Sequence, residues 1–501
     1  MKKVIFSVSL FILLVLIACQ APDEKEDAPV LVTIGDSITM GIQDAGLIDD
    51  YQSASYPYLV ARQLGIEADF HQPLVTTPGI GVPPYAKPLT LNGTTIVSEL
   101  LATDANGRPV ISINSMLPLL PTVAYAEPYN NLGISGAKLL DLRNTMSYTD
   151  PDAAGNFFFD LVLRTTIPSL AGKTVIQQAA MLNPDFILLW IGNNDILQAE
   201  LKGCGVNGLV DGVAFPRTDP ATFQTEYEAI LTNLQANTPA RIVMANIPDW
   251  LPFTNGLDGI FKVDSTFFAG HLMIFNPTTF EPILFDLNAD GTGDTYIPLF
   301  LEETDARHLL LTGATAYMEE GQGIPSQDDL EYMGIATGTA TNMVAALSTV
   351  MGLQGITIPA SAVALTGDLT ITEAEQGAAL SIIEQYNTAI SALGVSLNIP
   401  VVDIAGDWWG ADTATTTTPF GGYSGEFVLR AKDTTVFSLD GVHPNNLGQA
   451  LCANSFIRVL NAEYGLDLDE LAPASYAGQY SARAIDSRSL LRSIRGMAVL
   501  P

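Results

Sequence analysis

The chain has 501 residues, of which 48% are hydrophobic and 15% are charged. This length and composition allow a large buried core, and the 42 glycines and 30 prolines follow no period, which excludes collagen-like and low-complexity classes. The formal net charge is −32; loss of Lys2 and Lys3 with a leader would make it −34, from 20 basic and 54 acidic residues. So acidic a protein is not expected to bind nucleic acid electrostatically, and solubility alone is the favoured explanation of the charge.

The chain begins with a segment typical of a secretion signal. Two lysines precede the nearly unbroken apolar run Val4–Ile17, which is too short to span a membrane comfortably. The run continues into Ala18-Cys19 and so resembles a bacterial lipobox, in which the signal peptide is cut before a cysteine that is then acylated. The sequence therefore predicts a signal peptide over 1–18, a lipid anchor on Cys19 and an acidic tether over 19–29. The alternative is an ordinary signal peptide with a chance cysteine.

The anchor predicts a location. A lipidated cysteine would attach the protein to the bacterial cell envelope, at the outer membrane, and the membrane would be a partner only through that lipid. Acidic residues directly after Cys19 are similar to the surface-export signals of some outer-membrane lipoproteins.

The first strand is predicted directly after the tether. Leu31-Val32-Thr33-Ile34 has good strand propensity and runs into Gly35-Asp36-Ser37. In open α/β sheets, ligands bind at the carboxyl ends of the strands. A buried strand that ends in Gly-Asp-Ser therefore presents a serine hydroxyl at a ligand-binding edge.

The elements expected after this strand alternate between helix and strand. In chain order they are a helix over 53–64 stopped by Gly65, a short strand over 68–71, a strand-to-helix turn over 129–137 with about two helical turns to Leu142, a helix over 173–182, an apolar strand over 186–191, a helix over 219–236, a strand over 241–246, a helix over 372–397, a strand over 400–404 and a final helix over 446–464. This alternation predicts a doubly wound parallel sheet.

Three stretches show no clear pattern. They are 72–118, an excursion rich in Pro, Gly and Thr; about 250–345, predicted to be an insertion or cap; and 405–435, a loop that carries Trp408, Trp409, Phe420 and Tyr423. The sequence predicts one domain over 30–465 that includes them, followed by a C-terminal extension over 466–501.

Metal and disulfide chemistry have weak signals. Asp286–Asp294 matches the first half of a calcium-binding loop, but Ile297 stands where the bidentate glutamate belongs, so an Asx-rich turn is favoured. No Cys/His cluster has metal-ligand spacing, and no metal or cofactor is expected. Cys204 and Cys452 are read as two separate buried thiols, with a disulfide between them as the alternative.

A nucleophilic serine needs a base, and the chain has four histidines: His71, His271, His308 and His443. Asp440 precedes His443 by three residues, a spacing that lets a carboxylate hold the Nδ1 proton in a tight turn. Asp305 precedes His308 by the same spacing, so spacing alone does not choose between them. The place of His443 directly before the final helix favours it as the base.

An ester substrate also needs donors for the oxyanion of its tetrahedral intermediate. The candidates are the backbone N–H of Ser37, the backbone N–H of Gly136 and the side-chain amide of Asn194, which follows a buried strand. Gly136 lets the backbone approach a substrate closely, although Gly133 competes with it for this assignment.

Four blocks occur in order: Gly-Asp-Ser, Asn-Leu-Gly-Ile-Ser-Gly-Ala, Gly-Asn-Asn-Asp and Asp-Gly-Val-His-Pro. Together they resemble the SGNH (GDSL) hydrolase family, and no Gly-x-Ser-x-Gly motif of α/β-hydrolases is present. The resemblance implies a three-layer α/β/α sandwich around a parallel, flavodoxin-like sheet. It implies Ser37 as nucleophile, His443 as base and Asp440 as its orienting carboxylate, with Ser37, Gly136 and Asn194 as oxyanion donors.

The family resemblance implies a serine esterase or lipase-type acyl hydrolase that acts on a small-molecule, lipid or glycan ester. Acyl-chain length and alcohol stay open, because lipases, arylesterases, thioesterases and carbohydrate deacetylases share these motifs. Carbohydrate O-deacetylation is the alternative within the enzyme class. A non-catalytic surface lipoprotein that binds a glycan or a partner is the alternative from another class.

Overall fold

The computed structural model describes residues 28–82, 125–150, 156–200, 217–248, 370–409 and 442–477, together with 436–438, 440 and shorter segments within 86–97, 209–214, 261–309 and 322–364. Among these residues, no helix is long and apolar enough to cross a membrane. The predicted signal peptide, the predicted lipidation site Cys19, the calcium-like stretch and most of 405–435 lie outside the described residues, and so do Cys204 and the end of the C-terminal extension.

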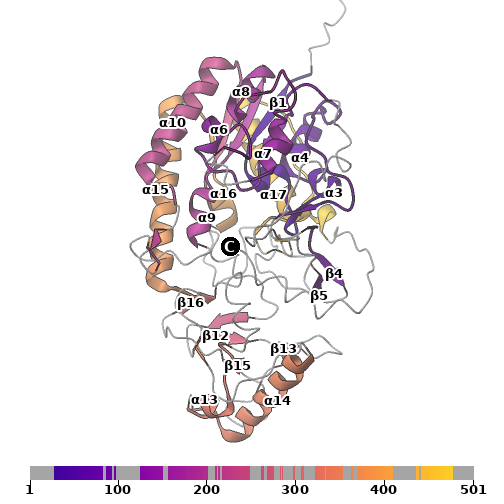
Figure 1. The fold of residues 1–501 in the computed structure, drawn as a ribbon. Coiled ribbons are helices and arrows are strands. Elements are labelled where there is room, and N and C mark those ends of the chain that lie inside the picture. The colour runs from indigo at the N-terminus through magenta and orange to yellow at the C-terminus, as the bar shows by residue number, and fades with distance from the viewer. Residues whose placement is uncertain are drawn as a thin grey trace, which may run out of the picture.

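A five-stranded parallel sheet forms the centre of the fold (Figure 1). Its strands are β1 (Leu31–Gly35), β6 (Asn131–Gly133), β7 (Phe186–Trp190), β10 (Arg241–Ala245) and β18 (Val401–Val402). They lie in the order β6-β1-β7-β10-β18, and each neighbouring pair is parallel. This is the flavodoxin-like 2-1-3-4-5 order. The predicted doubly wound parallel sheet is confirmed.

The strands are apolar because both faces of the sheet are covered. Along β7, Ile187 and Leu189 pack into the core on one face, while Phe186, Leu188 and Trp190 pack into the core on the other. Successive side chains of a strand point to opposite faces, so two cores require an unbroken apolar run. All five residues of β7 are buried.

Helices complete two outer layers. α4 (Tyr56–Gln63) packs against α17 (Asn446–Tyr464) over one face, and α8 (Val175–Met181), α10 (Pro220–Asn237) and α15 (Glu373–Leu397) cover the other. Figure 1 shows α10 and α15 side by side along one flank of the sheet. The remaining helices beside the sheet are α2 (Ser37–Met40), α3 (Asp49–Gln52), α6 (Asp141–Asn144), α7 (Phe158–Leu163), α9 (Asn194–Glu200) and α16 (Ile404–Trp409). This is a three-layer α/β/α sandwich.

Local chemistry explains where several helices begin. Thr174 and Gln177 form a reciprocal capping box at the start of α8. The Asp219 carboxylate accepts from the backbone N–H groups of Ala221 and Thr222, and Pro220 occupies the first turn of α10, where its missing N–H costs nothing. The helix predicted over 219–236 therefore matches α10 closely.

Some predicted boundaries were wrong. The helix predicted over 53–64 begins at Tyr56 and is preceded by a separate turn of helix, α3. The short strand predicted over 68–71 is turn and coil; this segment still meets the sheet region, because the His71 carbonyl accepts from the N–H of Asn130 at 2.8 Å. The strand predicted over 400–404 is only β18, since α16 begins at Ile404.

The helix predicted directly after Ala137 was also wrong. The structure has a loop there, and α6 starts at Asp141. Leu139 donates its N–H to Asp195 at 2.9 Å, and the Ala137 carbonyl accepts from Asn194 at 3.0 Å. Bonds to a distant segment thus take the backbone groups that a helix would have used internally.

The polypeptide between β10 and α15 carries the predicted insertion. Its described elements are β11 (Phe261–Asp264), β12 (Phe268–Leu272), β13 (Ile274–Phe275), β14 (Pro282–Ile283), β15 (Ile297–Pro298), β16 (Ala306–Leu309), α13 (Gln327–Tyr332), α14 (Thr337–Leu353) and β17 (Thr370–Thr372). Their described β-pairings are antiparallel and lie outside the central sheet. The chain enters this segment from β10, at the carboxyl edge of the sheet, and leaves it through α15. The labelled elements of the segment lie in the lower part of Figure 1.

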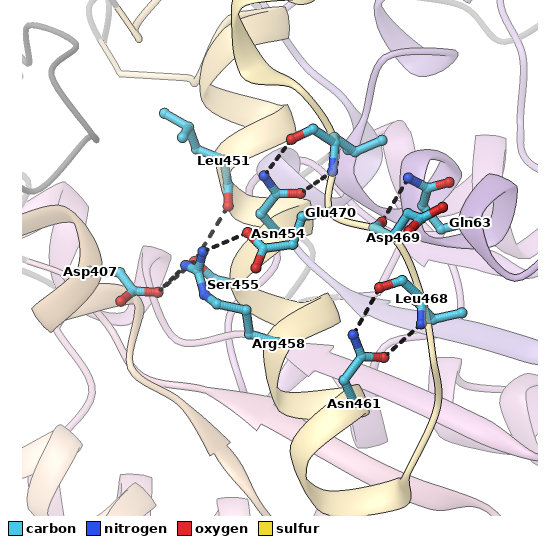
Figure 2. Close-up of polar contacts among 11 residues, drawn as sticks. Gln63, Asp407, Leu451, Asn454, Ser455, Arg458, Asn461, Leu468, Asp469 and Glu470 are labelled. Atoms are coloured by element: carbon cyan, nitrogen blue, oxygen red, sulfur yellow. Dashed lines mark hydrogen bonds and ion pairs between the residues drawn. The ribbon is translucent and has the colours of Figure 1, made fainter.

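The first described part of the C-terminal extension lies along α17 (Figure 2). Asn461 and Asn454 each use a side-chain amide to pair with one backbone unit of this segment, at Leu468 and Leu471, over 2.8–3.0 Å. Each amide therefore forms the pair of backbone hydrogen bonds that a neighbouring strand would otherwise form. Arg458 adds an ion pair to Glu470 at 3.1 Å. The segment ends in a short 3₁₀ helix, η4 (Pro473–Tyr476).

Cys452 lies on α17 as a buried free thiol. This agrees with the favoured interpretation for that residue.

Candidate active site

Ser37 is the first residue of α2, directly after the carboxyl end of β1. Gly35 permits this junction, because a Cβ there would lie 2.1 Å from Thr39 Oγ1 and 2.4 Å from the Trp190 carbonyl oxygen. Thr39 is held in turn by a 2.9 Å hydrogen bond between its hydroxyl and that of Tyr56 on α4. The serine therefore sits on a turn that is packed from both sides.

His443 reaches the serine from the other end of the chain. Its Nε2 lies 2.9 Å from Ser37 Oγ, and its Nδ1 lies 2.8 Å from Asp440 Oδ2. The His443 side chain is 13% exposed and that of Asp440 is 9% exposed, so the three groups form a partly shielded line. The structure brings together all three residues that the sequence singled out.

The Asp440 carboxylate accepts four N–H groups. Oδ1 accepts the backbone N–H groups of Val442 and His443 at 2.9 and 2.8 Å, while Oδ2 accepts the Ala45 N–H at 2.6 Å besides His443 Nδ1. Burial by itself would raise the pKa of Asp440, but the charge of His443 and these hydrogen bonds outweigh it and hold the pKa at about 2.

This low pKa assigns the tautomer of the histidine. An ionised carboxylate can only accept, so His443 Nδ1 carries the proton and Nε2 presents its lone pair to the Ser37 hydroxyl.

Gly136 and Gly133 are distinguished by their surroundings. The Gly136 φ is +77°, in a turn closed by a 3.1 Å bond from Ala137 N–H to the Ile134 carbonyl, and Gly136 is exposed. Gly133 lies inside β6, where a Cβ would be 2.4 Å from Met40 N, and its N–H is bonded to Asn131 Oδ1. Gly136 is therefore the glycine that has a backbone N–H available for a ligand.

The predicted oxyanion donors come from neighbouring strands. Ser37, Gly136 and Asn194 follow β1, β6 and β7, three adjacent parallel strands, so they share one sheet edge. Within the described part of the chain, the N–H groups of Ser37 and Gly136 donate no hydrogen bond. Asn194 uses one amide hydrogen on the Ala137 carbonyl at 3.0 Å, which ties the Gly136 loop to α9 and leaves its second amide hydrogen unassigned.

One pair beside the site was missed by the sequence interpretation. Asp36 is buried and accepts from the Asn193 side-chain amide at 2.8 Å and from the Ile38 N–H at 3.1 Å. Burial raises its pKa to about 6, against these two hydrogen bonds. Its place within Gly-Asp-Ser, and that of Asn193 within Gly-Asn-Asn-Asp, was the available signal.

The raised pKa of Asp36 predicts a pH-dependent stability. Between about pH 4 and 6 the folded protein keeps a proton on Asp36 that the unfolded chain releases, so this residue lowers the free energy of unfolding as pH rises. Asp36→Asn cannot ionise. We expect its free energy of unfolding, relative to wild type, to increase by about 1–3 kcal/mol from pH 4 to pH 7, measured by urea denaturation.

Glu228→Gln, which removes an exposed carboxylate from α10, is the control for loss of one surface charge. A relative stability of Asp36→Asn that is constant over this pH range would contradict the raised pKa.

Of the other three histidines, the structure describes the side chain of His71 alone. His71 is half-buried, and its ring packs on Tyr125 with centroids 4.2 Å apart. The described side chains contain no group of three or more His, Cys, Asp or Glu that could hold a metal ion.

Comparison with known proteins supplies the family. The model of the GDSL-like lipase/acylhydrolase family matches residues 31–267. This part of the chain is therefore similar to the GDSL-like lipase/acylhydrolase family. The matched residues include Ser37, Gly136 and Asn194, whereas Asp440 and His443 lie beyond them and are placed by the geometry alone. The match indicates a hydrolase.

No curated protein matches the chain at a significant level. Among solved structures, the chain is matched to an alpha/beta hydrolase enzyme, LAE5, from the metagenome of Lake Arreo, Spain. The match has 11% sequence identity and a TM-score of 0.30, over 86% of this chain and 94% of that chain. Similarity at this level carries no argument about fold or activity.

Proposed function

We propose that this protein is a carboxylic ester hydrolase of the GDSL type, which works through an acyl-serine intermediate from a lipid anchor on Cys19 in the bacterial cell envelope. The observation that carries the proposal is the hydrogen-bonded line from Ser37 Oγ to His443 Nε2 and from His443 Nδ1 to Asp440 Oδ2. This line lies at the sheet edge where ligands of such folds bind.

In the proposed reaction, Ser37 Oγ attacks the ester carbonyl carbon while His443 Nε2 takes the hydroxyl proton. Asp440 stays ionised and stabilises the imidazolium that forms. The tetrahedral intermediate collapses to acyl-Ser37, and the leaving alkoxide takes the proton from His443. Water then attacks the acyl-enzyme by the same proton route and releases the acid.

The oxyanion of the intermediate is proposed to accept from the N–H groups of Ser37 and Gly136 and from the Asn194 amide. These donors are already oriented by the packed turn at Gly35 and by the bond from Asn194 to Ala137, so little reorganisation is needed as charge develops.

Asn194→Ala tests this assignment. We expect a roughly hundredfold loss of kcat with little change in KM, because an oxyanion donor interacts most strongly with the transition state. Steady-state kinetics on one soluble ester measures the effect. A change in KM alone would make Asn194 a residue that binds the ground state.

The function itself is tested with a series of p-nitrophenyl esters from acetate to palmitate. The protein would start at Gln20, which avoids the lipid. Hydrolysis that requires Ser37 supports the proposal, and the preferred chain length distinguishes a small acyl pocket from a long one. Folded protein that hydrolyses no ester in the series would contradict it.

A further inference from the structure

A two-residue turn, Asp44-Ala45, follows the helix α2 that begins at Ser37. Gln43 and Gly46 exchange two backbone hydrogen bonds, of 3.0 and 2.9 Å, and the residues between them, Asp44 and Ala45, have φ values of +52° and +50°. Two successive positive φ values define the type I′ hairpin turn, in which glycine is strongly preferred at the second position. Alanine at that position is strained, since its Cβ disfavours the left-handed region.

Both backbone amides of this turn bind the segment that carries the histidine. The Ala45 N–H donates to Asp440 Oδ2 at 2.6 Å, and the Asp44 N–H donates to Ser438 Oγ at 2.8 Å. The Ser438 N–H in turn donates to the His443 carbonyl at 2.8 Å. The strained turn therefore contacts Asp440 directly and is linked to His443 through Ser438.

Side chains lock the turn in place. The buried Asp44 carboxylate accepts the Tyr51 hydroxyl at 2.5 Å, and the Gln43 amide donates to Asn446 Oδ1, at the start of α17, at 2.8 Å. Toward the nucleophile, Gly41 and Ile42 both donate their N–H groups to the Ser37 carbonyl, at 3.1 and 3.0 Å. A chain of short contacts thus runs from Ser37 through the turn to Asp440.

We infer that the Asp44–Ala45 turn is a positioning element that holds Asp440, and through it His443, in register with Ser37. The inference rests on the proposed function for its catalytic meaning, and on the contacts themselves for the placement. Strained backbone persists where the surroundings over-determine it, and here the surroundings are the two acceptors on the histidine segment.

The inference predicts how the turn responds when one acceptor is removed. Ser438→Ala deletes the partner of the Asp44 N–H without adding bulk, so the turn can relax toward negative φ and withdraw the Ala45 N–H from Asp440. Once the carboxylate is no longer aligned, the hydrogen bond that it accepts from His443 Nδ1–H weakens. We therefore expect the Nδ1–H proton resonance of His443 to move upfield and kcat/KM to fall by about 10- to 100-fold.

Ala45→Gly supplies the rescue. Glycine adopts positive φ without strain and keeps its N–H, so it should hold the turn without help from Ser438. We expect Ala45→Gly alone to raise the Tm. The double variant Ala45→Gly/Ser438→Ala should regain the wild-type Nδ1–H resonance of His443, and its kcat/KM should return to within about twofold of wild type.

The experiment measures the Nδ1–H proton resonance of His443 by NMR of protein labelled with ¹⁵N-histidine, next to kcat/KM. The chain has four histidines, so His443→Gln assigns the signal. An Nδ1–H resonance that stays unchanged or moves downfield in Ser438→Ala would overturn the inference. So would a double variant as impaired as Ser438→Ala, because a hydroxyl that only packs within 436–445 cannot be replaced by a glycine on another element.

The two proposals fail separately. If no ester is cleaved, yet the Nδ1–H resonance of His443 moves upfield in Ser438→Ala and returns in the double variant, the positioning role stands and the esterase proposal fails. If Ser37→Ala abolishes hydrolysis while Ser438→Ala leaves that resonance unchanged, the esterase proposal stands and the positioning role fails.

Discussion

Ser37→Ala is expected to fold like the wild type and to lose about three or more orders of magnitude in kcat, because the acyl-enzyme route disappears. Folding should survive because the change removes one oxygen from a side chain at the first position of α2, without disturbing the Gly35 junction. His443 Nε2 then loses its only contact with the nucleophile, while its bond to Asp440 remains.

The measurement combines ester hydrolysis with labelling by a fluorophosphonate, which modifies an activated serine. We expect the label on Ser37 in the wild type and none on the variant. Ser381→Ala, at an exposed position of α15, is the matched control and should keep both the label and the rate. Near-wild-type turnover by Ser37→Ala would contradict the assignment of Ser37 as the nucleophile.

Asp440→Asn is expected to lower kcat by about 10³- to 10⁴-fold, with little change in shape. The four N–H groups around this side chain match a carboxylate, which only accepts. An amide offers one acceptor oxygen, so one pair of donors must face its NH₂ group. If that pair is His443 Nδ1 and the Ala45 N–H, the histidine takes the other tautomer and Nε2 can no longer accept the serine proton.

The control for this variant lies elsewhere in the sequence. Asp305→Asn changes the carboxyl group that precedes His308 with the same spacing. We expect Asp305→Asn to keep kcat within about twofold. A large loss in Asp305→Asn, with activity retained in Asp440→Asn, would identify His308 as the base and contradict the geometry at His443.

The sheet edge that bears the site also receives the long segment between β10 and α15. The family match ends at residue 267, within this segment. We therefore expect this segment to affect mainly the preferred acyl-chain length in the ester series, since loops at the carboxyl ends of strands shape ligand sites in such folds.

Much of the scaffold could be predicted because its signals are local. The apolar run of β7 is by itself enough to predict a strand that is buried on two faces. Asp219 and Pro220 likewise predict the start of α10. The loop before α6 was mispredicted as helix because its conformation depends on a distant element. Asn194 and Asp195, both in α9, form hydrogen bonds with its backbone groups.

The chemistry of the site was predictable in kind. Gly-Asp-Ser at the end of an apolar strand and Asp-x-x-His before the last helix indicate a serine and its base. The spacing of Asp305 and His308 is identical, however, so sequence alone could not show which histidine meets Ser37. No role was predicted for Asp36, because the raised pKa of its carboxyl group comes from burial, which the local sequence does not show.

Neighbouring residues were enough to predict β1, β7 and β10, the long helices and the candidate nucleophile and base, since propensity, capping and apolar periodicity are local properties. The folded structure alone brings His443 to 2.9 Å from a serine 406 residues away. It also decided that Ala45 adopts φ +50° and that Asp440 accepts four N–H groups. These features depend on contacts between distant segments, which form only when the sheet and its two outer layers bring those segments to the same edge.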